Sequence, residues 1–136
     1  MKTMEELRTP PVEQRARGRV LVVDDDPDIL ELISIILREE GMDVVIARSG
    51  RQALHFLRTE NGVDVVLLDL VLPETDGFAV LEAMHQKGTG SNVPVVAFSA
   101  HDSMRFEALE AGAEAFLPKP FELDQLVSTV RDLGDG

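Results

Sequence analysis

The sequence predicts an α/β fold in which five βα repeats build a doubly wound, five-stranded parallel sheet. From Arg19 onward, short β-branched runs alternate with helical patterns, which is typical of βαβ units. Gly41, Gly62 and Gly112 follow the ends of helical segments, where a left-handed residue can close a helix. A length of 136 residues, 44% of them hydrophobic, suits one compact domain.

Five apolar runs are the predicted strands, and they comprise residues 20–23, 44–47, 63–68, 93–98 and 115–117. The third and fourth are apolar enough to be buried on both faces of a sheet. The segments between the strands are predicted helices that cover the sheet. Asp26 and Pro27 resemble an N-cap followed by a first-turn proline. Two segments place their apolar residues on one helical face: Ile29, Leu30, Ile33, Ile36 and Leu37 in the first, and Leu123, Leu126, Val127 and Val130 in the last.

We divide the chain into a leader at residues 1–18, a domain at residues 19–133 and a tail at residues 134–136. The leader lacks apolar periodicity, contains Pro10 and Pro11, and mixes acidic with basic residues. It is therefore expected to be mobile, with a short helix around residues 4–7. Because the tail follows the last helix at once, we expect no output domain.

The composition limits the cellular compartment and the classes of partner that we expect. Cysteine is absent, no apolar stretch is long enough to cross a bilayer, and the N-terminus has acids where an export signal needs an apolar core. We therefore expect a cytoplasmic protein without membrane insertion. The formal charge of -12 repels the phosphates of nucleic acids, so we also expect no direct nucleic-acid partner.

Polar residues stand at the carboxyl ends of four predicted strands. Asp24 and Asp25 follow the first strand, Asp69 the third, Ser99 the fourth and Lys119 the fifth. Ligands of open α/β sheets bind at this edge, so these residues are predicted to converge in one crevice.

The predicted crevice has a chemistry of its own. Three carboxylates would repel one another unless a cation lay among them, and oxygen ligands without His or Cys favour Mg²⁺. With the negative charge screened, one carboxylate can attack phosphorus while the Lys119 ammonium and the Ser99 hydroxyl bind the transferred oxygens. The set therefore suits phosphoryl transfer to an aspartate.

Four motifs together resemble the response-regulator receiver family of two-component signalling. They are VLVVDDDPDIL, DVVLLDLVLPETDGFAVLE, VPVVAFSA and GAEAFLPKPF, in the expected order and spacing. The resemblance spans about residues 19–133 and implies the flavodoxin-like strand order 2-1-3-4-5. It also implies a cis peptide bond between Lys119 and Pro120.

The resemblance implies a role for each residue of the crevice. Asp69 would be the phosphoacceptor, Asp25 a direct magnesium ligand and Asp24 a supporting acid. The Val71 backbone carbonyl would be a further ligand of the metal, together with Asp69. Ser99 and Lys119 would hold the phosphoryl oxygens.

Other residues would transmit the effect of phosphorylation to the surface or set the lifetime of the phosphoryl group. Ser99 and Phe116 would form a switch that changes the surface of the fourth helix, fifth strand and fifth helix, with Met104 and Phe106 as partner contacts. The chain has no tyrosine, so Phe116 would act by packing alone. Val71, Ala100 and His101 would flank the phosphoryl group, and apolar Val71 cannot orient an attacking water.

As a family member, the protein would be a phosphoacceptor switch that assists its own phosphorylation and dephosphorylation, and not an enzyme. A sensor histidine kinase or a histidine phosphotransfer protein would be the donor, and a downstream protein the target. The protein would be a monomer or a phosphorylation-dependent dimer. We expect a stand-alone receiver, with excision from a larger regulator as the alternative.

Two other functions fit parts of the pattern. The triplet from Asp24 to Asp26 also resembles the opening motif of haloacid-dehalogenase-like phosphatases. Those enzymes use a longer core, and the late acids Asp124 and Asp132 here fall on the final helix. A pseudo-receiver would lack the acceptor, an acid of the pair or the lysine, and none of these is missing.

The same residues also have plain structural interpretations. The acids from Asp24 to Asp26 can form a solvated turn, although Asp26 and Asp28 suffice for the cap and the first helical turn and leave two acids unexplained. Asp76 and Gly77 are interpreted as a turn with a cap for the third helix. The three histidines are His55, His85 and His101. They share no ligand spacing and are interpreted as solvated or half-buried side chains. His101 is a partial exception because it lies two residues after Ser99.

Overall fold

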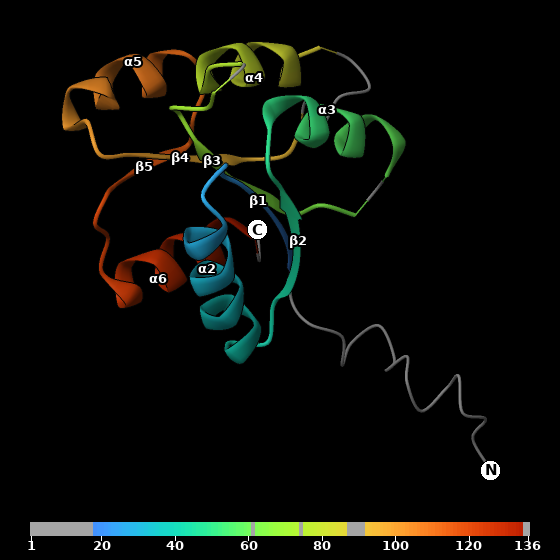
Figure 1. Ribbon diagram of the computed structural model, residues 1–136, viewed down its shortest axis with the longest axis vertical. Helices are drawn as coiled ribbons and strands as arrows, with labels where there is room; N and C mark the ends of the chain where they lie inside the picture. The colour runs from blue at the N-terminus through green and yellow to red at the C-terminus, as the bar shows by residue number, and fades with distance from the viewer. Residues whose placement is uncertain (1–17, 61, 74, 87–91, 135–136) are drawn as a thin grey trace.

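A computed structural model describes residues 18–60, 62–73, 75–86 and 92–134 of the chain. The short helix expected at residues 4–7 and almost all of the proposed leader lie outside these residues. Labelled as in Figure 1, the elements in chain order are β1 (Arg19–Val23), α2 (Pro27–Glu39), β2 (Asp43–Ala47), α3 (Gly50–Thr59), β3 (Val65–Asp69), α4 (Gly77–Met84), β4 (Val95–Ser99), the 3₁₀ turn η2 (Asp102–Met104), α5 (Arg105–Glu110), β5 (Ala115–Pro118) and α6 (Leu123–Gly134). None of the helices in the described ranges has the length and apolar character needed to cross a membrane.

The five strands form one parallel sheet in the order β2-β1-β3-β4-β5. This confirms the predicted doubly wound α/β fold and its flavodoxin-like strand order. The order reverses at β1, so the carboxyl ends of β1 and β3 are neighbours at the reversal point. In the register of β3 and β4, Asp69 lies opposite Phe98, and in that of β4 and β5, Ser99 lies opposite Pro118.

Helices cover both faces of the sheet. Figure 1 shows α2 and α6 on one face and α3, α4 and α5 on the other. Because side chains of a strand alternate between faces, each strand feeds two separate apolar clusters. In β4, Ala97 packs toward α3, α4 and α5, and Phe98 packs toward α2 and α6. In β5, Phe116 packs in the cluster beneath α3, α4 and α5, and Leu117 packs in the cluster beneath α2 and α6.

The strand ends differ slightly from the expected ranges. The third and fourth strands begin two residues later than predicted, at Val65 and Val95. Pro94 has no N–H to donate to the ladder, although its carbonyl accepts from Val66 at 3.0 Å. Both strands then run one residue further, so Asp69 and Ser99 are the last residues of their strands rather than the residues that follow them.

The predicted helix caps are confirmed. The Asp26 side chain accepts from the N–H of Asp28 at 2.9 Å, with Pro27 in the first turn of α2. Asp76 caps α4 by accepting from the N–H of Ala79 at 2.8 Å. Gly41 and Gly112 take the positive φ values that end α2 and α5, at 86° and 109°.

Candidate functional site

The carboxyl ends of the strands surround an acidic crevice. Asp24 directly follows β1, Asp69 ends β3 and Lys119 directly follows β5. Parallel strands bring these ends to one edge of the sheet, so residues 95 positions apart in sequence come into contact. The crevice has a volume of about 310 Å³ and is lined by Asp24, Asp25, Asp26, Asp69, Val71, Ala100, His101 and Lys119.

Three carboxylates of the crevice form a cluster. Asp24, Asp25 and Asp69 each offer an oxygen within 4.8 Å of the others. Asp24 is fully buried, Asp69 is 4% exposed and Asp25 is exposed. A cluster of oxygen donors with two buried members fits a hard divalent cation such as Mg²⁺.

Backbone groups orient the two buried acids. The N–H of Asp24 donates to the carbonyl of Ala47 at 3.1 Å, and Asp24 Oδ1 accepts from the N–H of Asp26 at 2.9 Å. Asp69 Oδ1 accepts from the N–H of Val71 at 2.9 Å. In each acid one carboxylate oxygen is held by the backbone, and the other faces Lys119.

The Lys119 ammonium bridges the two buried acids. Its Nζ lies 3.1 Å from Asp24 Oδ2 and 3.1 Å from Asp69 Oδ2. The Lys119 N–H donates to the carbonyl of Ser99 at 2.8 Å, which ties the start of this loop to the end of β4. The Lys119–Pro120 bond is cis, as the resemblance implies.

Burial and charge act on both ionisable partners. Burial raises the pKa of Asp69, and the Asp24 charge adds to the rise, although the Val71 N–H and Lys119 oppose it. Burial by itself would lower the pKa of Lys119, but the charges of Asp69 and Asp24 outweigh it and raise that pKa. Burial and charge together therefore disfavour the ionised form of Asp69, even with the Lys119 ammonium beside it.

This balance predicts how stability depends on pH. A raised pKa means that protonated Asp69 favours the fold, so its contribution is present at acidic pH and is lost as the pH rises through the folded-state pKa. In the presence of EDTA, Asp69→Asn should therefore have a higher free energy of unfolding than the unmodified protein at pH 8, by on the order of 1 kcal/mol, and less advantage at pH 5. Urea denaturation at both pH values measures the difference.

If Mg²⁺ binds to the carboxylate cluster, it should reduce the advantage of the Asn variant. At ten times its dissociation constant, Mg²⁺ would stabilise the unmodified protein by roughly 1.4 kcal/mol and the Asn variant by less. An Asn variant no more stable than the unmodified protein in EDTA at pH 8 would contradict the charge balance described above.

Ser99 lies beside the crevice and is only 1% exposed. Its Oγ accepts from the N–H of His101 at 3.0 Å and donates to Met104 Sδ at 3.5 Å. In this structure the hydroxyl is therefore engaged with η2 and not with the acids.

Phe116 points to the face of the sheet that α5 covers. It is 5% exposed, and the Arg105 guanidinium lies 4.8 Å from the centroid of its ring. Arg105 also pairs with Asp102 at 3.0 Å, so η2 and α5 are tied together above the ring. The predicted switch residues Ser99 and Phe116 thus both contact this segment.

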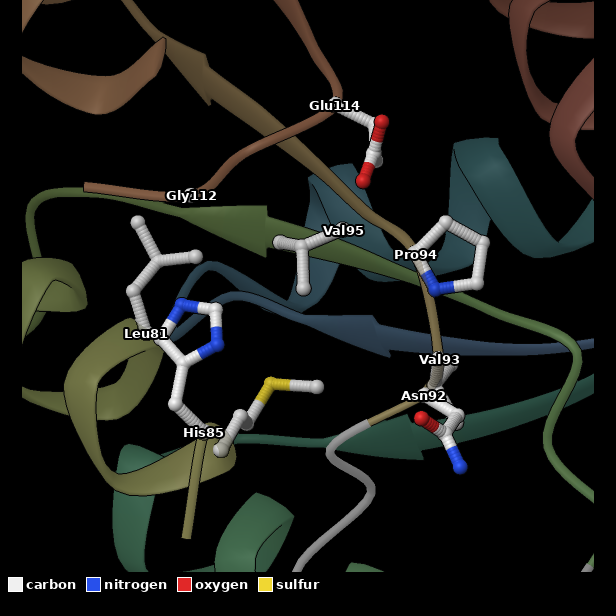
Figure 2. Close-up of a pocket in the computed structure, with 9 residues that line it drawn as sticks. Leu81, His85, Asn92, Val93, Pro94, Val95, Gly112 and Glu114 are labelled. Atoms are coloured by element: carbon white, nitrogen blue, oxygen red, sulfur yellow. The ribbon is translucent and has the colours of Figure 1, made fainter. Parts of the chain in front are cut away.

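The histidines occupy three separate places. His101 lines the crevice, and His55 is exposed on α3. Figure 2 shows His85 in a different cavity, near the amino ends of β4 and β5, where its imidazole lies beside Leu81. His85 Nε2 lies 3.1 Å from the carbonyl oxygen of Ala111, and the ring fills the space that a side chain at position 112 would need. His85 therefore has a packing role outside the acidic crevice.

Two residues next to the site were not found from the sequence. Gly77 packs so closely that a Cβ would lie 2.5 Å from Leu70 Cα and 2.7 Å from the Asp69 carbonyl oxygen. Phe98 presents its ring to Lys119, with Nζ 4.6 Å from the ring centroid. The sequence pattern indicates only a turn at Gly77 and an apolar strand residue at Phe98. Backbone approach and ring orientation have no signature in a single sequence.

The chain matches known proteins over most of its length. The family model described as the response regulator receiver domain matches residues 20–131. The DNA-binding response regulator MtrA of Mycolicibacterium smegmatis is 42% identical over 117 residues, which are 85% of this chain and 50% of that protein. The chain spans about half the length of the curated relatives it matches.

Solved structures show the same fold. The receiver domain of the Francisella response regulator 1452 has 35% identity and a TM-score of 0.79, covering 85% of this chain and 95% of that one. The response regulator protein TrrA of Thermotoga maritima, solved in complex with Mg²⁺ and BeF, has 31% identity and a TM-score of 0.77, covering 85% of this chain and 98% of that one.

The prediction that excluded nucleic acid as a direct partner is wrong. A relative that is 42% identical is named as DNA-binding. The charge of -12 is a property of these 136 residues, and the 117 matched residues make up only 50% of that relative. Net charge therefore describes the surface of this segment and does not decide what a whole regulator binds.

Proposed function

The chain belongs to the response regulator receiver family, and on this premise we propose that it is a phosphoacceptor switch whose acceptor is Asp69. The donor would be a phosphohistidine of a partner protein. The observation that carries the proposal is the contact of Asp69 Oδ2 with Lys119 Nζ at 3.1 Å, inside a cluster of three acids. A buried carboxylate with an ammonium beside it can attack phosphorus while the ammonium binds an oxygen of the transferred group.

We propose that Asp24, Asp25, Asp69 and the Val71 backbone carbonyl hold Mg²⁺. The oxygen-only cluster supports this, as does the TrrA neighbour that was solved with Mg²⁺ and BeF. When bound, the ion would supply charge that offsets the carboxylates and the phosphoryl oxygens. The protein itself contributes the nucleophile at Asp69 and the oxygen-binding ammonium at Lys119.

The output would be a change in the surface of α5, β5 and α6. We propose that the Ser99 hydroxyl leaves Met104 for a phosphoryl oxygen, which frees η2 and the Arg105 side chain above Phe116. The contacts of Ser99 with Met104 and of Arg105 with Phe116 support this route. The MtrA relative is named as DNA-binding, so for the whole regulator we propose an output directed at DNA.

The phosphorylated protein would also assist its own dephosphorylation, slowly. Val71 is 49% exposed at the rim of the crevice, and an apolar side chain there cannot orient an attacking water. We expect Val71→Asn to speed the loss of phosphate by about 10- to 100-fold. The decay of phosphoprotein after removal of the donor, followed by intact mass, measures this. Val71→Ala is the control, and faster decay in Val71→Ala than in Val71→Asn would contradict the hypothesis.

Incubation with acetyl phosphate and Mg²⁺ tests the function. We expect the protein to gain the mass of one phosphate, and no gain when EDTA replaces Mg²⁺. Catalytic release of phosphate without a phosphoprotein would instead indicate a phosphatase. A protein that neither gains nor releases phosphate would be a pseudo-receiver, and the proposal would then be wrong.

A further inference from the structure

An aromatic ring lies directly beneath the ammonium of the crevice. Phe98, in β4, is fully buried, and Lys119 Nζ lies over its ring at 4.6 Å from the centroid. The Phe98 ring packs edge-to-face against Phe121, with centroids 6.3 Å apart and an angle of 76° between the planes. This packing sets the orientation of the face that Phe98 presents to the ammonium.

The contacts of the ammonium within the described residues are of two kinds. Asp24 and Asp69 accept from it through carboxylate oxygens, and Phe98 attracts it through the ring. Both carboxylates are proposed metal ligands, and oxygens that serve a metal are weaker partners for an ammonium. A phenyl ring offers no ligand to a hard cation such as Mg²⁺. Of these partners of the Lys119 ammonium, the Phe98 ring is therefore the one that a bound metal ion would not also contact.

We propose that Phe98 is a positioning residue, whose ring holds the Lys119 ammonium in the crevice through a cation–π interaction while the carboxylates serve the metal. The inference rests on the proposed function and adds a residue that acts through Lys119. The side chain of Lys119 is 22% exposed, and cation–π attraction is stronger where water is largely excluded.

A purely packing role for Phe98 predicts different results. A buried phenylalanine fills volume whatever its electrons do, so replacing it with leucine would disturb the site under either interpretation. Fluorine atoms on the ring remove most of the negative charge from its face and change its size little. Fluorination therefore separates the attraction for the ammonium from the volume of the ring.

The first measurement needs no activity and begins with the metal-free protein. Protons at the end of the Lys119 side chain lie over the ring face, so their NMR signals should be shifted upfield in the free protein. We expect the shift to persist when Mg²⁺ is added and to disappear in Phe98→Leu. Lys119 signals without an upfield shift, or a shift that vanishes with Mg²⁺, would overturn the proposal.

The second measurement is beryllofluoride binding with Mg²⁺, followed by titration. Mono-, di- and trifluorinated phenylalanine at position 98 should weaken binding stepwise, with a total loss of roughly 2- to 30-fold. The matched control places the same fluorinated phenylalanines at position 56, because Phe56 lies in α3 and packs in the apolar cluster on the other face of the sheet. These substitutions should leave the affinity for beryllofluoride unchanged. Equal effects at positions 98 and 56 would overturn the positioning role.

The two proposals fail in distinguishable ways. An unmodified protein that takes up neither phosphate nor beryllofluoride would overturn the phosphoacceptor function, and with it the role of Phe98 in that function. An unmodified protein that takes up both, with no dependence on fluorination at position 98, would overturn only the role of Phe98.

Discussion

Asp69→Ala is expected to abolish the gain of one phosphate from acetyl phosphate and Mg²⁺. The substitution removes the proposed nucleophile, and the remaining buried acid, Asp24, is fully buried and therefore less open to a phosphoryl donor than Asp69, which is 4% exposed. Asp25 is exposed, and the Lys119 ammonium, which would bind the transferred oxygens, contacts Asp24 and Asp69 instead. The expected loss is complete and not a reduction in rate.

The control lies at the other end of the same strand. Asp64 precedes β3 and accepts from the N–H of Arg19 at 2.7 Å, so Asp64→Ala removes an acid from the opposite edge of the sheet. We expect Asp64→Ala to take up phosphate as the unmodified protein does, as measured by intact mass. A full gain of phosphate in folded Asp69→Ala, with folding verified by circular dichroism, would show that another residue is the acceptor.

Lys119→Met should have the second largest effect, because it removes two functions at once. Loss of the ammonium that binds the transferred oxygens should slow phosphorylation by about 10²- to 10³-fold, the usual cost of removing one such donor. It also leaves Asp24 and Asp69 buried without their positive partner. Stability should therefore fall by about 3 kcal/mol in EDTA. Rates from intact mass and free energies of unfolding from urea denaturation test the two effects separately.

Two further variants show whether the stability loss arises from uncompensated charge. Lys119→Arg keeps the charge but changes its shape, so it should recover more of the stability than of the phosphorylation rate. Adding Asp69→Asn to Lys119→Met removes one of the unpaired charges, so the double variant should be more stable than Lys119→Met alone. A double variant that is less stable than Lys119→Met would contradict charge repulsion as the cause.

Much of the fold and the chemistry of the site could be predicted because both depend on local patterns. Alternating β-branched runs and amphipathic segments predicted the strands and the order of the elements. The cap at Asp26 and the cap at Asp76 were predictable because N-capping uses a side chain and a backbone N–H only two or three residues apart. The acids and the lysine stood out because each occurs at the end of a strand.

Other features could not be read from local patterns. The contact between Ser99 Oγ and Met104 Sδ depends on the path of η2 after the strand. The close approach of Gly77 to Leu70 depends on how α4 packs behind β3. The prediction that excluded nucleic acid was wrong for another reason. The net charge describes only the given chain, whereas the related regulator has further residues outside the matched half, and the charge gives no information about them.

The sequence by itself determined the fold class, the strand ends that carry polar residues and the kind of chemistry that three carboxylates and a lysine can perform. Only the tertiary structure decided that Lys119 lies between Asp24 and Asp69 and over the ring of Phe98. The physical reason is distance along the chain: these contacts join residues up to 95 positions apart. Their geometry follows from the register of the parallel strands and from side-chain packing, and neither is encoded in a local pattern.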